Sequence, residues 1–241
     1  MIRAVSKQGF TLIELMLSMS FISVLLIAIA LTIIQISNIY NHGLTIKDVN
    51  QSARSISSEL QSGISQAVPF SIASGTGSHY IQSAWGGRLC VGQYSYIWNY
   101  GVNINNAITT NNYSDSNLNV YVTTPSTIIR FVKVPDTNAV YCTQTNGKYP
   151  DIASTNAVDL LNAGDHSLAI HSFSIASAAG AIDAKTNERL YTISFLIGTN
   201  DQNALVSGST SCKPPSVSGA DPTYCSVQQF TLAVRAGNAI R

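Results

Sequence analysis

The chain has 241 residues, of which 13 are Lys or Arg and 12 are Asp or Glu, so its formal net charge is only +1. Charged residues make up 10% of the chain, against about 25% in a typical soluble domain, and uncharged Ser, Thr, Asn and Gln supply the polarity instead. This balance offers no electrostatic footprint for nucleic acid, and the 45% apolar content excludes disorder driven by net charge.

One long apolar run, Phe10–Ile36, lies near the amino terminus, whereas a multi-pass membrane protein would need several such runs. As a helix rising about 1.5 Å per residue, its first 25 residues would extend roughly 37 Å, enough to cross a hydrocarbon core of about 30 Å. Arg3 and Lys7 precede the run, and the next basic residue is Lys47. The positive-inside rule therefore predicts a cytoplasmic amino terminus, with residues 38–241 across the membrane.

Two simpler interpretations of this run are open. A secretory signal peptide has an apolar core of about 7–15 residues and a small-residue cleavage site, but this run is longer and is followed by Asn38 and Tyr40. A plain signal anchor leaves Glu14, the only charge in the run, without an explanation. A carboxylate among apolar helix residues is costly unless it is paired, and it usually marks a function.

The segment Lys7–Met16 reads K-Q-G-F-T-L-I-E-L-M, and it resembles the processing site of type IV prepilins and pseudopilins. The resemblance implies that a membrane-embedded aspartyl prepilin peptidase cuts between Gly9 and Phe10 on the cytoplasmic side. Residues 1–9 would then be a cytoplasmic leader, and the same enzyme would N-methylate Phe10. Because glycine has no side chain, Gly9 would let the peptidase approach the backbone closely.

The resemblance also implies a partner for Glu14. In the family, the matching glutamate pairs with the positive amino terminus of a neighbouring subunit during assembly. Each charge is costly in the apolar core of a fibre, and the two together neutralise one another. Because Phe10 lies about one helical turn before Glu14, an intramolecular pairing is the alternative.

A second periodic pattern predicts that residues 37–68 continue the helix in amphipathic form. Apolar residues recur there at spacings of three and four, at Ile46, Val49, Ala53, Ile56, Leu60, Ile64 and Val68. Pro69 predicts the end of the helix. Gly43 lies between the two halves, where it either introduces a kink or a locally melted turn or is simply tolerated at a cost of about 1 kcal/mol.

Residues 69–241 are expected to form a β-rich globular head, which makes the fold class α+β. Predicted strands are Tyr80–Trp85, Leu89–Asn99, Leu118–Thr123, Thr127–Val134, Ala139–Thr143, Leu168–Ile175, Leu190–Ile197 and Val227–Arg235. One short helix is predicted at Ala157–Asn162. The aromatic residues of Tyr94–Tyr100 form either an adhesive or subunit-contact surface or a strand whose aromatic side chains alternate into the core.

This architecture resembles a pilin, in which one long helix packs against an antiparallel sheet. The length of the mature chain is similar to that of the large minor pilins of the W/J type, which lie near the fibre tip and prime assembly.

Four cysteines follow the apolar run, on the predicted outer side of the membrane, where disulfides persist. They allow three connectivities, of which we predict Cys212–Cys225 and Cys90–Cys142. The first would close a loop rich in Pro, Ser and Gly, which cannot be held by packing and would gain roughly 3 kcal/mol from the bridge. Crossed pairs and four buried free thiols are the alternatives.

No motif for catalysis is recognisable among the four histidines and the scattered acids: H-E-x-x-H, G-x-S-x-G and P-loop patterns are missing from the sequence. Five aspartates could supply a calcium site or be solvated loop carboxylates, and their spacing does not match an EF-hand; they are Asp136, Asp151, Asp159, Asp165 and Asp183. We therefore expect no enzymatic activity, no cofactor and no metal.

The sequence thus predicts a structural minor pilin or pseudopilin subunit that assembles through its helix into a type IV pilus or a secretion pseudopilus. Expected partners are the prepilin peptidase and N-methyltransferase, other pilin or pseudopilin subunits, the inner-membrane assembly platform and membrane lipid. The expected location is the cytoplasmic membrane, with the head outside, and the fibre after assembly. The alternative is a pilus-tip binding module for adhesion or DNA uptake, although nucleic acid is not expected as a main partner. A membrane-anchored enzyme ranks last.

Overall fold

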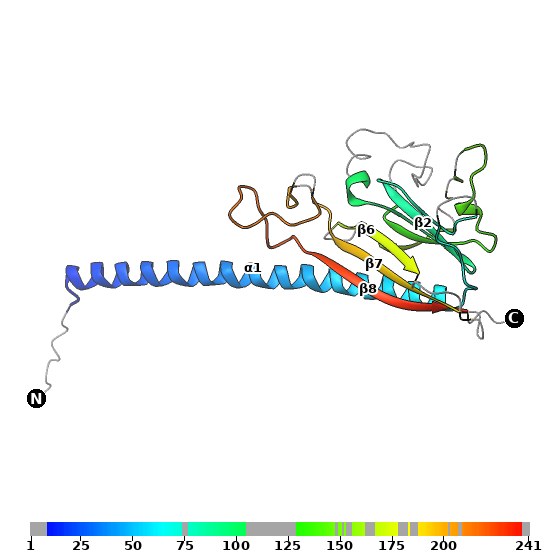
Figure 1. Cartoon of the computed structure of the whole chain (residues 1–241). Coiled ribbons are helices and arrows are strands. Elements are labelled where there is room, and N and C mark those ends of the chain that lie inside the picture. The colour runs from blue at the N-terminus through cyan, green and yellow to red at the C-terminus, as the bar shows by residue number, and fades with distance from the viewer. Residues whose placement is uncertain are drawn as a thin grey trace, which may run out of the picture.

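The computed structural model describes residues 9–73, 77–104, 129–147, 149–150, 152, 156–161, 167–177, 183, 188–201, 203–206 and 209–237. One helix, α1 (Leu12–Ser65), is 54 residues long, and its amino-terminal half projects away from a head built of β-strands (Figure 1). The described part of the chain is therefore α+β, with a long amino-terminal helix and antiparallel sheets.

The helix α1 is continuous through Gly43 and ends at Ser65, before the expected end at Val68. A locally melted turn at Gly43 is therefore wrong, and the glycine is accommodated within the helix. After Ser65 the amide of Ala67 still bonds to the carbonyl of Ile64. Pro69 follows two residues later, consistent with its role in ending the helix.

The carboxyl-terminal half of α1 packs against the head through the predicted apolar stripe. Val49, Ala53, Ile56, Leu60 and Ile64 are all fully buried. At the start of the stripe the buried residue is Thr45, whereas Ile46 is partly exposed. The Thr45 hydroxyl lies 3.1 Å from the carbonyl oxygen of Asn41 and 3.2 Å from that of Thr223, so this buried hydroxyl has hydrogen-bond acceptors.

The head contains two antiparallel sheets in the described residues. The first has the order β1 (Tyr80–Gln82), β2 (Gly86–Val91), β3 (Tyr94–Asn99), β4 (Phe131–Pro135) and β5 (Val158–Leu161). The second has the order β6 (Leu168–Ser177), β7 (Arg189–Thr199) and β8 (Val227–Ala236). A parallel bridge between Tyr100 and Ile170 joins the two sheets.

The main core lies where α1 and both sheets meet, and aromatic rings form its centre. The Trp98 ring lies 4.2 Å from that of Phe173 between centroids, and Phe173 in turn lies 6.2 Å from Phe195. Tyr96 and Trp98 are fully buried. The aromatic segment Tyr94–Tyr100 is thus a core strand as one alternative predicted, and an adhesive surface at this place is wrong.

Two of the predicted strands are divided by turns. The expected strand Leu89–Asn99 is a hairpin of β2 and β3 that turns at Gly92 and Gln93. Gly92 has a φ of 60°, which suits the first central position of a two-residue hairpin turn. The expected strand Tyr80–Trp85 ends at Gln82. In the turn that follows, the Ser83 hydroxyl accepts a hydrogen bond from the backbone amide of Trp85.

Two other predicted elements have the wrong type. Ala139–Thr143 is not a strand, because Val140–Cys142 form a 3-10 helix, η1. Ala157–Asn162 is not a helix, because β5 occupies Val158–Leu161 and pairs with β4. The predicted strand Leu118–Thr123 lies outside the described residues, whereas β6, β7 and β8 confirm the last three predicted strands.

Candidate functional site

The candidate site begins at the two residues that precede α1. Gly9 and Phe10 are exposed and belong to no helix or strand. A side-chain carbon added at Gly9 would meet no atom within 4 Å. The peptide bond between these residues is therefore open to an approaching enzyme, and exposed segments of this kind are where proteases cut most readily.

Thr11 and Glu14 form a capping box at the start of α1. The backbone amide and the hydroxyl of Thr11 both donate to Oε2 of Glu14, at 2.9 and 2.8 Å. The Glu14 amide donates back to the Thr11 hydroxyl at 3.4 Å. Sequence reasoning identified Glu14 but missed Thr11, although T-x-x-E before an apolar run is the pattern of a capping box.

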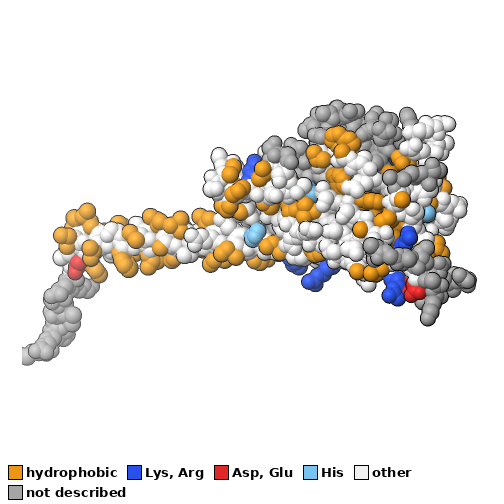
Figure 2. Space-filling model, viewed as in Figure 1, with side chains coloured by type: hydrophobic (Ala, Val, Ile, Leu, Met, Phe, Trp, Pro, Cys, Tyr) orange, Lys and Arg blue, Asp and Glu red, His pale blue; other side chains and the backbone are white. Residues whose placement is uncertain are grey.

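The amino-terminal half of α1 exposes an apolar surface on all sides. Every residue from Phe10 to Tyr40 is exposed, and Figure 2 shows hydrophobic side chains along the whole projecting half of the helix. Monomeric soluble proteins rarely expose contiguous apolar patches larger than a few hundred Å², so this surface requires a lipid or protein environment. Within the described residues, α1 is the one helix long and apolar enough to cross a membrane.

A shallow hollow lies on the helix surface next to the capping box. It is lined mostly by apolar groups and includes Glu14, Leu17, Ser18, Ser20, Phe21 and Val24. Its apolar lining lies within about three turns of Glu14, the one carboxylate in this half of the helix.

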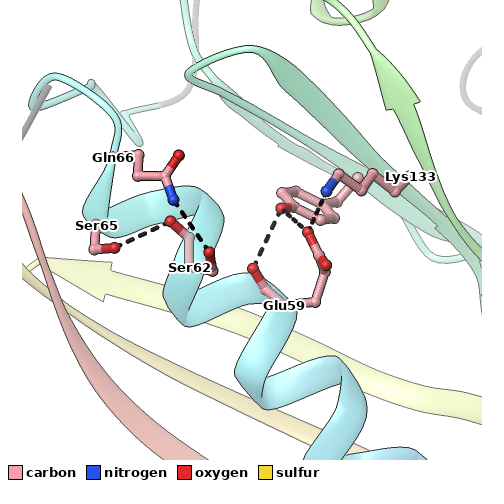
Figure 3. Close-up of polar contacts among 6 residues, drawn as sticks. Glu59, Ser62, Ser65, Gln66 and Lys133 are labelled. Carbon is pink, nitrogen blue, oxygen red and sulfur yellow. Dashed lines mark hydrogen bonds and ion pairs between the residues drawn. The ribbon is translucent and has the colours of Figure 1, made fainter. Parts of the chain in front are cut away.

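A polar cluster fixes the head to the other half of α1 (Figure 3). Lys133 on β4 forms an ion pair with Glu59 of α1, and the Tyr96 hydroxyl donates to the same carboxylate at 3.1 Å. Burial, and then the negative charge of Glu59, raise the pKa of Tyr96, so the phenol remains a neutral donor. The cluster thus links β3 and β4 to α1 through one carboxylate.

The end of α1 is closed by short hydrogen bonds that Figure 3 also shows. The Ser65 hydroxyl donates to the carbonyl oxygen of Ser62 at 3.0 Å, and the Gln66 side-chain amide donates to the Ser62 hydroxyl at 3.2 Å. These side-chain bonds add to the backbone bond that the Gln66 amide donates to the Ser62 carbonyl oxygen at 3.4 Å.

All four cysteines are bonded, in the two pairings expected from the sequence. Cys90–Cys142 joins β2 to η1, and Cys212–Cys225 closes a loop with a sequence separation of 13. The second loop contacts α1 directly, because Asn41 donates to the Tyr224 hydroxyl at 3.3 Å and Thr45 donates to the Thr223 carbonyl. The crossed pairings and the free thiols are wrong.

The aspartates considered as calcium ligands do not come together in the described residues. Asp136 accepts hydrogen bonds from the Ser95 hydroxyl and from the amides of Val140 and Tyr141, which holds η1 in place. Asp159 and Asp183 are exposed, and Asp151 and Asp165 lie outside the described residues. Among the residues that the structure describes, no group of three or more His, Cys, Asp or Glu could hold a metal ion.

Comparison of the chain with models of known protein families, with curated proteins and with solved structures gave no match.

Proposed function

We propose that the chain is a minor pilin or pseudopilin subunit, a structural protein that assembles through α1 into a type IV pilus or a secretion pseudopilus. The observation that carries the proposal is the exposed apolar half of α1, which follows an accessible Gly9–Phe10 bond and holds a single carboxylate, Glu14. Prepilin peptidase cuts that bond, and the new amino terminus is methylated at Phe10. The apolar half of α1 serves first as the membrane anchor and then as the fibre core.

The capping box supports a specific way for Glu14 to take part in assembly. Both donors of Thr11 reach the same oxygen, Oε2. A carboxylate has two oxygens with about four acceptor positions, so Oε1 can accept a hydrogen bond from the methylated ammonium group of a neighbouring subunit. The Thr11 contacts orient the carboxylate, and the incoming cation neutralises it in an apolar surrounding, where an unpaired charge is costly.

The head supports the proposal through its attachment to only one half of the helix. Burial of α1 begins near Asn41, and the residues before it are free to contact lipid or other subunits. The Glu59–Lys133 pair and the apolar stripe keep the head fixed on the remaining half. Subunits in which the head covers only the carboxyl-terminal half of α1 can bring the apolar halves of their helices together in a fibre, while their heads remain on the outside of that fibre.

The processing step tests the proposal directly. The full chain is co-expressed with a prepilin peptidase, and the amino terminus of the membrane-bound protein is determined by mass spectrometry. We expect a mature chain that begins with N-methylated Phe10. The variant Gly9→Val should remain uncleaved, because the side chain obstructs the approach to the backbone, while the matched variant Gly43→Ala should be processed normally. An intact leader in the parent chain, or a start other than Phe10, would contradict the proposal.

A further inference from the structure

The loop closed by Cys212–Cys225, called here the 212–225 loop, is the first part of the head to meet α1 among the residues that the structure describes. Its Tyr224 and Thr223 contact Asn41 and Thr45, at the place where the helix changes from exposed to buried. In Figure 1 the orange-brown connection between β7 and β8, which contains this loop, overhangs the middle of α1 toward its amino-terminal half. The loop therefore forms the edge of the head nearest to the apolar half of the helix.

The length of the free helix sets the level of this edge relative to a membrane. Asn41 follows Phe10 by 31 residues, which at a rise of ~1.5 Å per residue corresponds to about 46 Å along the helix axis. A bilayer with its headgroup regions is about 40–45 Å thick. When Phe10 lies among the cytoplasmic headgroups, Asn41 reaches the outer surface of the opposite headgroups. The head then begins where the membrane ends.

The side chains at this level have the chemistry of a membrane interface. Tyr40 and Tyr224 are exposed and come from distant parts of the chain, and the hydrogen bond from Asn41 holds the Tyr224 ring beside the helix. Tyrosine is enriched at membrane–water interfaces, where its ring lies at the headgroup level. Val217 adds an exposed aliphatic group to the same loop. In the 212–225 segment Lys213 and Asp221 balance one another, so the contact does not depend on lipid charge.

The 212–225 loop is also held in one shape. Turns are closed by Val217, whose amide bonds to the Pro214 carbonyl, and by Ala220, whose amide bonds to the Val217 carbonyl. The disulfide joins its two ends, and Cys212 and Cys225 pack with Ala204 and Leu205. A preorganised surface loses little conformational entropy when it binds, which favours contact of the loop with lipid as a unit.

We propose that the 212–225 loop, together with Tyr40, is a lipid-binding edge on which the head rests against the outer leaflet of the membrane before assembly. The inference rests on the proposed function, because it requires α1 to span the bilayer. In this position the helix cannot slide further into the membrane, and the head keeps a defined orientation relative to the bilayer plane. Extraction of the subunit into a fibre must break the contact.

Fluorescence quenching by brominated phosphatidylcholine tests the proposal on the full chain in vesicles. Bromine atoms attached near the top of the acyl chains quench an indole that lies at the interface, and a second lipid with bromine atoms near the ends of the chains quenches an indole in the middle of the span. Three variants each add one Trp to the parent chain. Val217→Trp reports on the loop, Val140→Trp reports on η1, and Ile27→Trp reports on the middle of the span. Val217 and Val140 are exposed to a similar degree, 46% and 49%, so the indole's own affinity for lipid is matched.

We expect brominated lipid to remove most of the fluorescence that Val217→Trp adds, and to leave the fluorescence added by Val140→Trp unchanged. Equal signals from Val217→Trp in brominated and ordinary vesicles would overturn the lipid contact, provided that Ile27→Trp is quenched. Quenching of both valine variants would also overturn it, since the head would then lie on the membrane without a preferred edge. An unquenched Ile27→Trp would instead refute the membrane span, and with it the proposed function.

Discussion

Thr11 and Glu14 bond to one another in both directions at the start of α1, with the Thr11 hydroxyl 2.8 Å from Oε2 of Glu14 and the Glu14 amide 3.4 Å from the Thr11 hydroxyl. The first amide groups of a helix have no partner within the helix, and the Thr11 hydroxyl supplies one for the amide of Glu14. The pair therefore serves two purposes. It provides a hydrogen-bond acceptor for an amide in the first turn of the helix, and it orients the carboxylate that we propose for assembly.

The charge of Glu14 is expected to be necessary for assembly. Glu14→Gln keeps the shape of the side chain and an oxygen that can accept from Thr11, but it removes the negative charge that pairs with a neighbouring amino terminus. We expect this variant to accumulate in the membrane fraction at the parent level and to be strongly depleted from sheared fibres, as judged by immunoblotting. Ser23→Ala, on the same exposed half of α1 but outside the hollow beside Glu14, is the matched control and should assemble normally. Normal incorporation of Glu14→Gln would remove the residue from its proposed role.

The hydroxyl of Thr11 is expected to matter through its effect on Glu14. Thr11→Val is nearly isosteric but loses the side-chain donor to Oε2 and the acceptor for the Glu14 amide, while the backbone bond from residue 11 remains. We expect fewer variant subunits in fibres than for the parent, but more than for Glu14→Gln. Thr11→Ser keeps the hydroxyl and should restore the parent level. If Thr11→Val and Thr11→Ser assemble equally well, the hydroxyl does not orient the carboxylate.

The parts of the structure that could be predicted are those whose signal repeats along the chain. The stripe from Val49 to Ile64 recurs at helical spacing over several turns, and the residues of β6, β7 and β8 alternate over many positions. The stretch between Lys7 and Lys47, in which Glu14 is the one charged residue, similarly indicated the free half of α1. A pattern that repeats over many residues identifies a helix or strand reliably. It locates the ends of that element less well, because only a few residues mark each end.

The predictions that failed concern short segments whose structure depends on distant partners. Asp136 binds the amides of Val140 and Tyr141 and so stabilises a 3-10 turn where β-branched and aromatic residues favoured a strand. The helix expected around Ala157 is a strand because the edge of β4 is next to it. Thr11 is a different case, because the T-x-x-E pattern of a capping box lies inside the segment that resembles a processing site.

The ion pair between Glu59 and Lys133 should contribute measurably to stability, because both side chains are largely covered, with 27% and 20% exposed. A double-mutant cycle with Glu59→Gln and Lys133→Met, followed by urea unfolding of the full chain in detergent, should give a coupling energy of about 1 kcal/mol. The coupling should decrease as salt is added. The pair Arg235–Glu188, whose arginine is 65% exposed, is the control and should give a smaller value. Equal couplings for the two pairs would contradict this explanation.

The two disulfides are expected to stabilise the head by different amounts. Cys90–Cys142 spans 52 residues and Cys212–Cys225 spans 13. The entropy of the unfolded chain falls more when a longer loop is closed, which corresponds to about 4 kcal/mol for the first bridge and about 3 kcal/mol for the second. Urea unfolding of the two double Cys→Ser variants should therefore show the larger loss without Cys90–Cys142. The reverse order would indicate that the contacts of the 212–225 loop with α1, rather than loop entropy, dominate its contribution.

The imidazole of His171 should make the head less stable in acid. Its Nε2 lies 3.0 Å from the Thr199 carbonyl oxygen, and burial lowers the pKa of His171 below its usual 6.5, although hydrogen bonds to the carbonyls of Thr199 and Gly198 oppose the shift. His171 therefore binds a proton near pH 6.5 in the unfolded chain, whereas in the folded chain it binds one only at lower pH. The contribution to folding is fully present above the unfolded pKa and is lost as the pH falls from there toward the folded pKa. The loss is at most about 1.4 kcal/mol for each pH unit in that window.

The variant His171→Gln tests this prediction, because it retains an amide donor for Thr199 but does not titrate. Its free energy of unfolding, measured by urea at successive pH values, should fall less steeply than that of the parent between pH 7 and 5. Parallel curves for the two proteins would show that His171 does not cause the loss.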